Sequence, residues 1–174
     1  RLAPVVLRYL DAPDLLEMAV LSSRTTHAAA ECLDACRLFA TVLSRALHGQ
    51  GKDDVLELSG VQVSSEGLRG IAEGRYRSKS RDQIHGTGYV VHSLEAALWC
   101  FASTDCFADA VLAAANLGDD ADTTAAVVGQ VAGAFYGASG LPAHWLERLH
   151  QRADIEQLAD SLANPVASVD RRRP

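Results

Sequence analysis

The chain contains one acidic turn that leads into an apolar helix: Gly118-Asp119-Asp120-Ala121-Asp122-Thr123-Thr124, followed by Ala125-Ala126-Val127-Val128-Gly129-Gln130-Val131-Ala132-Gly133-Ala134. Residues 106–117 precede the turn with an apolar helical pattern, and Gly118 is suited to end that helix. No charged residue occurs from 125 to 138, so the second helix is expected to be buried, with neighbours on every side. The acidic turn is therefore expected to join two core helices.

Asp119, Asp120 and Asp122 place three carboxylates within four positions of this turn. In one interpretation an Asp caps the second helix, whose dipole favours negative charge. A cap needs one Asp only, and the others repel unless a cation or hydrogen-bond donors compensate them. In the other interpretation Asp120, Asp122 and Thr123 are oxygen ligands of a hard divalent cation, because their spacing across a helix start directs three oxygens to one point. The residues alone leave both interpretations open.

Three segments together resemble the ADP-ribosylglycohydrolase family, which includes the glycohydrolase that reactivates dinitrogenase reductase. The acidic turn and its helix resemble the C-terminal metal motif of that family. Ser22-Ser23-Arg24-Thr25-Thr26-His27 resembles its Thr-His segment, and Gly86-Thr87-Gly88-Tyr89-Val90-Val91-His92-Ser93-Leu94-Glu95-Ala96-Ala97-Leu98-Trp99 resembles its Gly-Tyr-Val segment. The resemblance covers roughly residues 2–162. It implies an all-α fold and a hydrolase that cleaves the glycosidic bond between ADP-ribose and a protein side chain.

The resemblance also implies six site residues: the metal ligands Asp120, Asp122 and Thr123, and the ADP-ribose contacts His27, Gly88 and Tyr89. The cofactor would be Mg²⁺ or Mn²⁺, as one ion or two, and no catalytic residue is assigned. On general grounds a lone His at a helix junction such as His27 more often caps or packs than binds a ligand, and Tyr89 is equally typical of a core residue. Asp119 is expected to cap the helix or to support the ligands.

Family members build the site from two halves, the first of which carries a Thr-Asp-Asp cluster that is absent here. Residues 1–163 are therefore expected to be the C-terminal part of a single domain, residues 164–174 a flexible tail, and the chain alone inactive. The alternative is an inactive ADP-ribose-binding protein or a structural protein, since the lens J-crystallins of jellyfish resemble the same fold. Uncovered apolar helix faces would also favour self-association.

The composition limits the classes of function. A formal net charge of −6 argues against a nucleic-acid-binding surface, and no apolar run is long enough for a membrane span. With 174 residues, 48% hydrophobic and only 6% aromatic, the chain is suited to one domain of closely packed helices. It opens with no signal-peptide pattern, and its four cysteines are expected to be buried thiols, so a cytoplasmic location is expected.

Three further segments carry predictions. Residues 52–63 are ambiguous between strand and helix. Residues 74–86 are basic and flanked by glycines, and are either a solvated charge run or a rim that attracts a phosphate-bearing ligand. The Gly129-x-x-x-Gly133 spacing predicts the close approach of a neighbouring helix.

Overall fold

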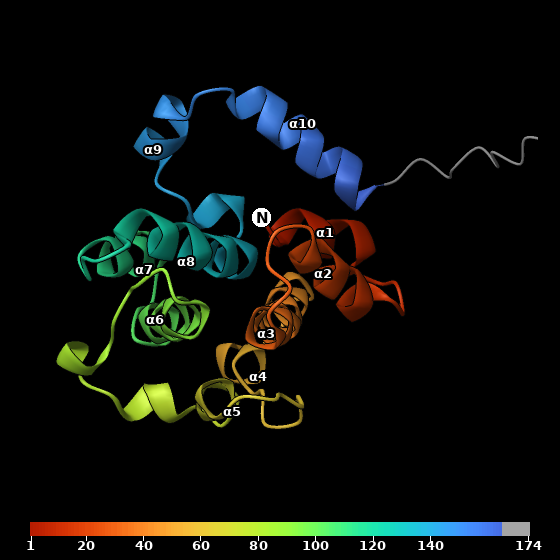
Figure 1. Ribbon diagram of the computed structural model, residues 1–174. Coiled ribbons are helices and arrows are strands. Elements are labelled where there is room, and N and C mark those ends of the chain that lie inside the picture. Colours follow the sequence, from red (N-terminus) through yellow and green to blue (C-terminus); the bar gives the residue numbers. More distant parts are fainter. Residues whose placement is uncertain (165–174) are drawn as a thin grey trace, which may run out of the picture.

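The computed structural model describes residues 1–164, in which helices are the only regular elements. The helices are α1 (Ala3–Tyr9), α2 (Leu15–Arg24), α3 (Ala30–Leu47), α4 (Lys52–Val55), α5 (Glu66–Ala72), η1 (Arg75–Ser78), η2 (Arg81–Gln83), α6 (Val90–Ala102), α7 (Phe107–Ala115), α8 (Ala121–Tyr136), η3 (Ala138–Gly140), α9 (Ala143–Arg148) and α10 (Arg152–Ala163). The all-α prediction is confirmed (Figure 1). Residues 165–174, which make up nearly all of the expected tail, lie outside the described residues.

Helix α8 lies between two groups of helices and packs against α7, α6 and α3 (Figure 1). Its residues Val128, Val131 and Ala132 are fully buried. Burial of this apolar surface is the main stabilising contribution that a core helix makes. Helix α3 connects α1 and α2, which form one group, with α6 and α8 of the other group, because it contacts all four helices.

Within the described residues α8 is not covered on every side, and the uncovered apolar face expected from the sequence is present. Ala126 is exposed, and a Cβ atom added at Gly129 would meet no atom within 4 Å. At Gly133 the nearest contact is the ring of Phe107 at 3.8 Å, an ordinary van der Waals distance. The two glycines therefore do not mark a close helix crossing within residues 1–164. Helix α8 has one buried face and one open face.

Several helix ends differ from the predicted ones. Helix α8 begins at Ala121, so that Asp122 and Thr123 belong to its first turn. Asp120 occupies the N-cap position, but its side chain makes no capping hydrogen bond. The ambiguous segment 52–63 forms the short helix α4 followed by turns, with no strand.

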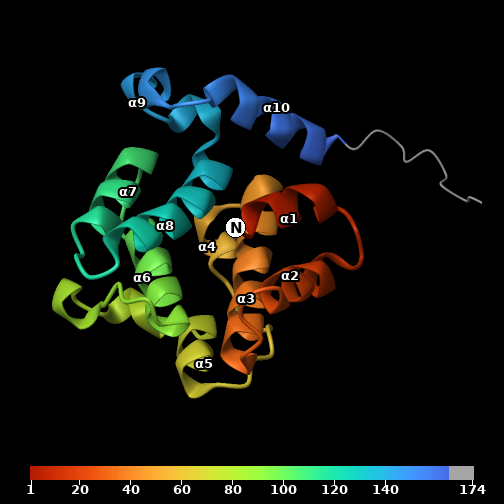
Figure 2. The ribbon, with the colours of Figure 1, turned by 45° about the horizontal axis from the view of Figure 1, so that its top comes forward.

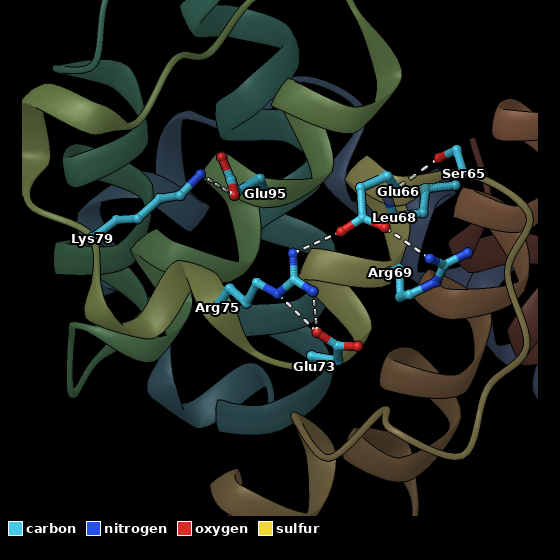
Figure 3. A network of polar contacts seen from close by, with 8 residues as sticks. All are labelled: Ser65, Glu66, Leu68, Arg69, Glu73, Arg75, Lys79 and Glu95. Carbon is cyan, nitrogen blue, oxygen red and sulfur yellow. Dashed lines mark hydrogen bonds and ion pairs between the residues drawn. The ribbon is translucent and has the colours of Figure 1, made fainter.

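The basic segment 74–86 folds into η1 and η2, and most of its cations are paired (Figure 3). Arg75 contacts Glu66 at 2.8 Å and Glu73 at 2.6 Å, and Lys79 contacts Glu95 of α6 at 2.6 Å. These pairs hold the segment against α5 and α6. Because its cations already have partners, the segment is not a run of freely solvated charge.

Helices α9 and α10 lie together on one side of the molecule (Figure 2). Helix α10 contacts α1, and its residues Ile155 and Leu158 are 49% and 65% exposed. Among residues 1–164, no helix combines the length and the apolar character that crossing a bilayer requires.

Candidate active site

A cavity of about 540 Å³ opens where the turn between α2 and α3 meets the first turns of α6 and α8. Most buried lining residues, such as Ala35, Phe39 and Leu94, are apolar, and Ser93 adds one buried polar group. The polar lining residues Thr26 and His27 are exposed. Ligand cavities of this size commonly combine an apolar wall with a few polar groups that orient the ligand. The cavity is therefore the strongest candidate for a ligand site in the described part of the chain.

Four of the six predicted site residues line this cavity: His27, Gly88, Tyr89 and Thr123. They come from the α2–α3 turn, the start of α6 and the start of α8, which are far apart in the sequence. Asp120 and Asp122 do not line the cavity. No residue from 74 to 86 lines it either, so the prediction that this basic segment forms a phosphate-attracting rim is wrong for this cavity.

His27 follows the end of α2 and is exposed at the cavity opening. Its backbone N–H donates to the carbonyl of Ser23 at 2.7 Å, and its Nδ1 lies 2.9 Å from Oγ1 of Thr26. Helix α3 has Ala29 as its N-cap residue, so the imidazole of His27 caps no helix. The contact with Thr26 leaves Nε2 of His27 available for a ligand.

Tyr89 is the N-cap residue of α6 and is 46% exposed, so it is not a core residue. Its ring makes an edge contact with His92 at 5.1 Å between ring centroids, and Nδ1 of His92 lies 3.0 Å from Oγ1 of Thr87. Its hydroxyl donates to Oε2 of Glu31 at 2.7 Å, and this bond is the main cause that raises the pKa of Tyr89. The phenol is therefore held at the opening by contacts on two sides.

The acidic turn reaches the cavity through Thr123, and Asp120 lies next to the cavity residue Gly88. The backbone N–H of Asp120 donates to the carbonyl of Gly86 at 2.8 Å. A Cβ atom added at Gly88 would lie 3.5 Å from Oδ2 of Asp120, so this carboxylate is a direct neighbour of a cavity residue. Thr123 lines the cavity itself. Oxygens from the acidic turn are therefore placed beside the ligand space.

Asp120 and Asp122 lie close to each other at the start of α8. The backbone N–H of Thr123 is the main cause that lowers the pKa of Asp122 below its ordinary value. Within residues 1–164, neither carboxylate forms a salt bridge with a Lys, Arg or His side chain. Two adjacent carboxylates without a cationic partner repel each other, and their oxygens are donors that a hard cation prefers.

The number of side chains that could bind a cation here is nevertheless small. In the described residues, no three side chains of the His, Cys, Asp and Glu types are arranged to hold a metal ion. The acidic turn offers two carboxylates and the hydroxyl of Thr123, whereas a hard divalent cation prefers about six oxygens. The metal-ligand roles of Asp120, Asp122 and Thr123 therefore remain predictions.

Several cavity residues carry no recognisable signal in the sequence. Glu31 occurs in the first turn of α3, where an acidic residue is common for helix-dipole reasons and signals no ligand. Cys32 and Cys36 were expected to be buried thiols, but both are half-buried and line the cavity. Burial is the main cause that raises the pKa of Cys36. Glu31, Cys32 and Cys36 line the cavity because of where α3 lies relative to α6 and α8.

Comparison with known proteins gives a consistent result. The family model described as ADP-ribosylglycohydrolase matches residues 1–172. The ADP-ribosylarginine hydrolase Tri1 of Pseudomonas putida is 43% identical over 152 residues, which are 87% of this chain and 41% of that protein. The ADP-ribosyl-[dinitrogen reductase] glycohydrolase of Rhodospirillum rubrum is 29% identical over 157 residues, which are 90% of this chain and 51% of that protein.

A solved structure described as an ADP-ribosylglycohydrolase-related protein complex has the same fold. Its TM-score is 0.85 at 41% sequence identity, over 91% of this chain and 56% of that chain. The chain thus spans about half the length of the relatives that it matches. The family model, the sequence relatives and the solved structure agree, and the chain belongs to the ADP-ribosylglycohydrolase family.

Proposed function

We propose that this chain provides the ADP-ribose-binding part of a hydrolase site, and that the active protein cleaves the bond between ADP-ribose and an arginine side chain. The observation that carries the proposal is that His27, Gly88, Tyr89 and Thr123 line one cavity of about 540 Å³. Three separate segments of the chain supply these residues. The named activities of the Pseudomonas putida and Rhodospirillum rubrum relatives support the same reaction class.

The cavity residues suit different parts of an ADP-ribose molecule. The free Nε2 of His27 can exchange a hydrogen bond with a ribose or phosphate oxygen. Gly88 has no side chain, so a sugar can approach its backbone closely. The ring of Tyr89 presents a face against which a sugar or a base can pack. Together these groups bind and orient the ligand.

We further propose that Asp120, Asp122 and Thr123 hold a divalent cation, Mg²⁺ or Mn²⁺, beside this cavity. Their hard oxygen donors and the missing cationic partner in the described residues support the assignment. When bound, such a cation orients ribose hydroxyls and lowers the pKa of a water molecule. Glycoside hydrolysis passes through a transition state with oxocarbenium character, which nearby carboxylates stabilise electrostatically.

The linkage to arginine is proposed from the relatives whose printed name states it. The Tri1 protein of Serratia proteamaculans, 41% identical over 140 residues, carries the same name as that of Pseudomonas putida. A chimera tests the linkage: the matched portion of the Pseudomonas putida protein is replaced by this chain. We expect the chimera to release ADP-ribose from an ADP-ribosylarginine peptide and not from an ADP-ribosylserine peptide. Equal release from both peptides would contradict the proposed preference.

Binding of ADP-ribose by the chain itself tests the cavity assignment. Calorimetric titration with ADP-ribose in the presence of Mg²⁺ is expected to show saturable binding. The variant His27→Ala is expected to lose about 5- to 10-fold in affinity, which corresponds to about 1 kcal/mol for one lost hydrogen bond, with an unchanged melting temperature. His150→Ala is the matched control, because His150 is exposed and lies outside the cavity lining.

Two results would contradict the assignment: absence of binding at millimolar ADP-ribose, or equal effects of the two His variants. An assay for released ADP-ribose on the same sample separates a hydrolase from a binding protein. Three protein oxygens are fewer than the roughly six that a hard cation prefers, so we expect this chain alone to bind without rapid turnover.

A further inference from the structure

The acidic turn adopts a backbone conformation that needs external support. Gly118 and Asp119 are consecutive residues with positive φ, 81° and 53°. Glycine adopts this conformation readily, but for Asp119 it is unfavourable by about 1 kcal/mol. The turn also carries the three like charges of Asp119, Asp120 and Asp122, and the N-cap residue Asp120 makes no side-chain cap. Contacts from elsewhere must therefore hold the turn in place.

Arg81, in η2, holds the beginning of the turn. Its Nη2 atom donates to the carbonyl oxygens of Asn116 at 3.0 Å and of Leu117 at 2.9 Å. These carbonyls lie at the C-terminal end of α7, where backbone acceptors have no helical partner and the helix dipole is negative. One guanidinium group thus satisfies two acceptors and brings a positive charge to the acidic turn. It does so without a salt bridge to any of the three Asp side chains.

Gly86, five residues after Arg81, holds the end of the turn. Its carbonyl accepts from the backbone N–H of Asp120 at 2.8 Å and from Oγ1 of the buried Thr124 at 3.4 Å. A Cβ atom at Gly86 would lie only 2.9 Å from Oγ1 of Thr124, so a side chain there would push the two segments apart. The segment from Arg81 to Gly86 therefore contacts the turn immediately before and after its two left-handed residues.

The supporting segment is itself well anchored. At the start of η2 the side-chain Oε1 of Gln83 accepts from the backbone N–H of Ser80 at 2.9 Å, and Ile84 is buried. Lys79 pairs with Glu95 of α6, as Figure 3 shows. The indole N–H of Trp99 donates to the backbone carbonyl of Lys79 at 3.0 Å. The segment is thus fixed to α6, and through its contacts with the acidic turn it restricts the movement of that turn.

We propose that Arg81 is a positioning residue that, together with the carbonyl of Gly86, fixes Asp120 and Asp122 in the geometry that a divalent cation requires. The inference rests on the proposed cation site, and it assigns a role to a basic residue that neither lines the cavity nor contacts the predicted ligands. Groups that hydrogen-bond metal ligands directly commonly change metal affinity by about 10- to 100-fold when removed, and Arg81 acts one contact further away, so the lower end of that range applies.

The test compares Arg81→Gln and Arg81→Lys with the unaltered chain, and Arg77→Gln is the matched control. Arg77 is on the same basic segment, but its partner is the exposed Asp53 at 3.5 Å. Two quantities are measured: the Mn²⁺ dissociation constant by calorimetry, and amide hydrogen exchange across residues 116–124. For Arg81→Gln we expect about 10-fold weaker Mn²⁺ binding and faster exchange in this range, with an unchanged far-UV circular dichroism spectrum.

Arg81→Lys retains the charge but lacks the planar fork, so we expect an intermediate loss of Mn²⁺ affinity. It also serves as the second variant if Arg81→Gln does not fold. Affinity and exchange in Arg81→Gln that match those of Arg77→Gln would overturn the inference. If the unaltered chain binds no Mn²⁺, the proposed cation site fails instead, and unchanged exchange in the Arg81 variants would then separately reject the positioning role.

Discussion

The hydroxyl of Tyr89 donates a 2.7 Å hydrogen bond to the carboxylate of Glu31, a residue 58 positions earlier in the chain. Both residues line the cavity, so the bond links the first turn of α3 to the N-cap of α6 at the cavity wall. The ring of Tyr89 is thereby held at the cavity opening, with nearly half of its surface exposed.

The first prediction concerns this tyrosine. We expect Tyr89→Ala to weaken ADP-ribose binding by about 3- to 10-fold, because an aromatic face contributes about 0.5–1.5 kcal/mol beyond its buried area. Tyr89→Phe keeps the face and removes only the bond to Glu31, so its affinity should change less. Calorimetric titration measures both. Equal losses in the two variants would show that the hydroxyl, and not the ring face, binds the ligand.

The second prediction separates ligands from neighbouring charge. Asp120→Asn and Asp122→Asn are each expected to weaken Mn²⁺ binding by at least about 10-fold while the helix content stays the same. Asp119→Asn removes the same charge from an adjacent exposed position, and Asn tolerates the left-handed backbone of residue 119 well. It should therefore keep most of the affinity. If all three variants lose affinity equally, the effect comes from net charge, and the two ligand assignments are wrong.

The third prediction uses two glycines in different surroundings. Gly86→Ala is expected to destabilise the protein by about 1–3 kcal/mol, because the new Cβ would lie 2.9 Å from Oγ1 of the buried Thr124. Gly129→Ala is expected to stabilise it by about 0.5–1 kcal/mol, because Gly129 is inside α8 and an added Cβ meets no atom within 4 Å. Urea denaturation measures both changes in the free energy of unfolding, and the slopes of its dependence on urea concentration are compared between variants. A destabilised Gly129→Ala would mean that another chain or a second copy covers this face of α8.

The fourth prediction concerns pH. The carbonyl of Ser44, 2.7 Å from Nδ1 of His48, is the main cause that raises the pKa of His48, and Asp11 at 3.1 Å from Nε2 adds to it. Because the folded pKa lies above the unfolded one, the protonated ring stabilises the fold most below the unfolded value. This contribution is lost as the pH rises through the folded pKa. His48 also follows the C-terminus of α3, where a positive charge is favourable.

We therefore expect a small fall in melting temperature as the pH is raised from slightly acidic to slightly alkaline, and His48→Gln should reduce that fall. The effect is small because both partners are solvent-exposed. His150→Gln is the control for the loss of a titrating ring elsewhere. If His48→Gln retains the pH dependence of the unaltered chain, another group is responsible for it.

Much of the architecture was predictable from the sequence because it depends on local patterns. Apolar residues at helical spacing identified α7 and α8, and the family resemblance implied the all-α fold. The resemblance of the acidic turn to the family motif also identified the family correctly. The first residue of α8 was less predictable. Its apolar run begins at Ala125, but the helix begins at Ala121, because polar residues in a first turn do not disturb the helical backbone.

The cavity and the support of the acidic turn were decided only by tertiary structure. Cys32 and Cys36 look like core residues in the sequence, and only the separation of α3 from the starts of α6 and α8 turns them toward a cavity. Arg81 belongs to a run that reads as surface charge, yet it reaches backbone carbonyls 35 and 36 residues away. Helical periodicity reports which face of a segment is apolar, because that property is local. It carries no information about which distant backbone groups or side chains a given residue will meet, since those contacts depend on how the helices pack together.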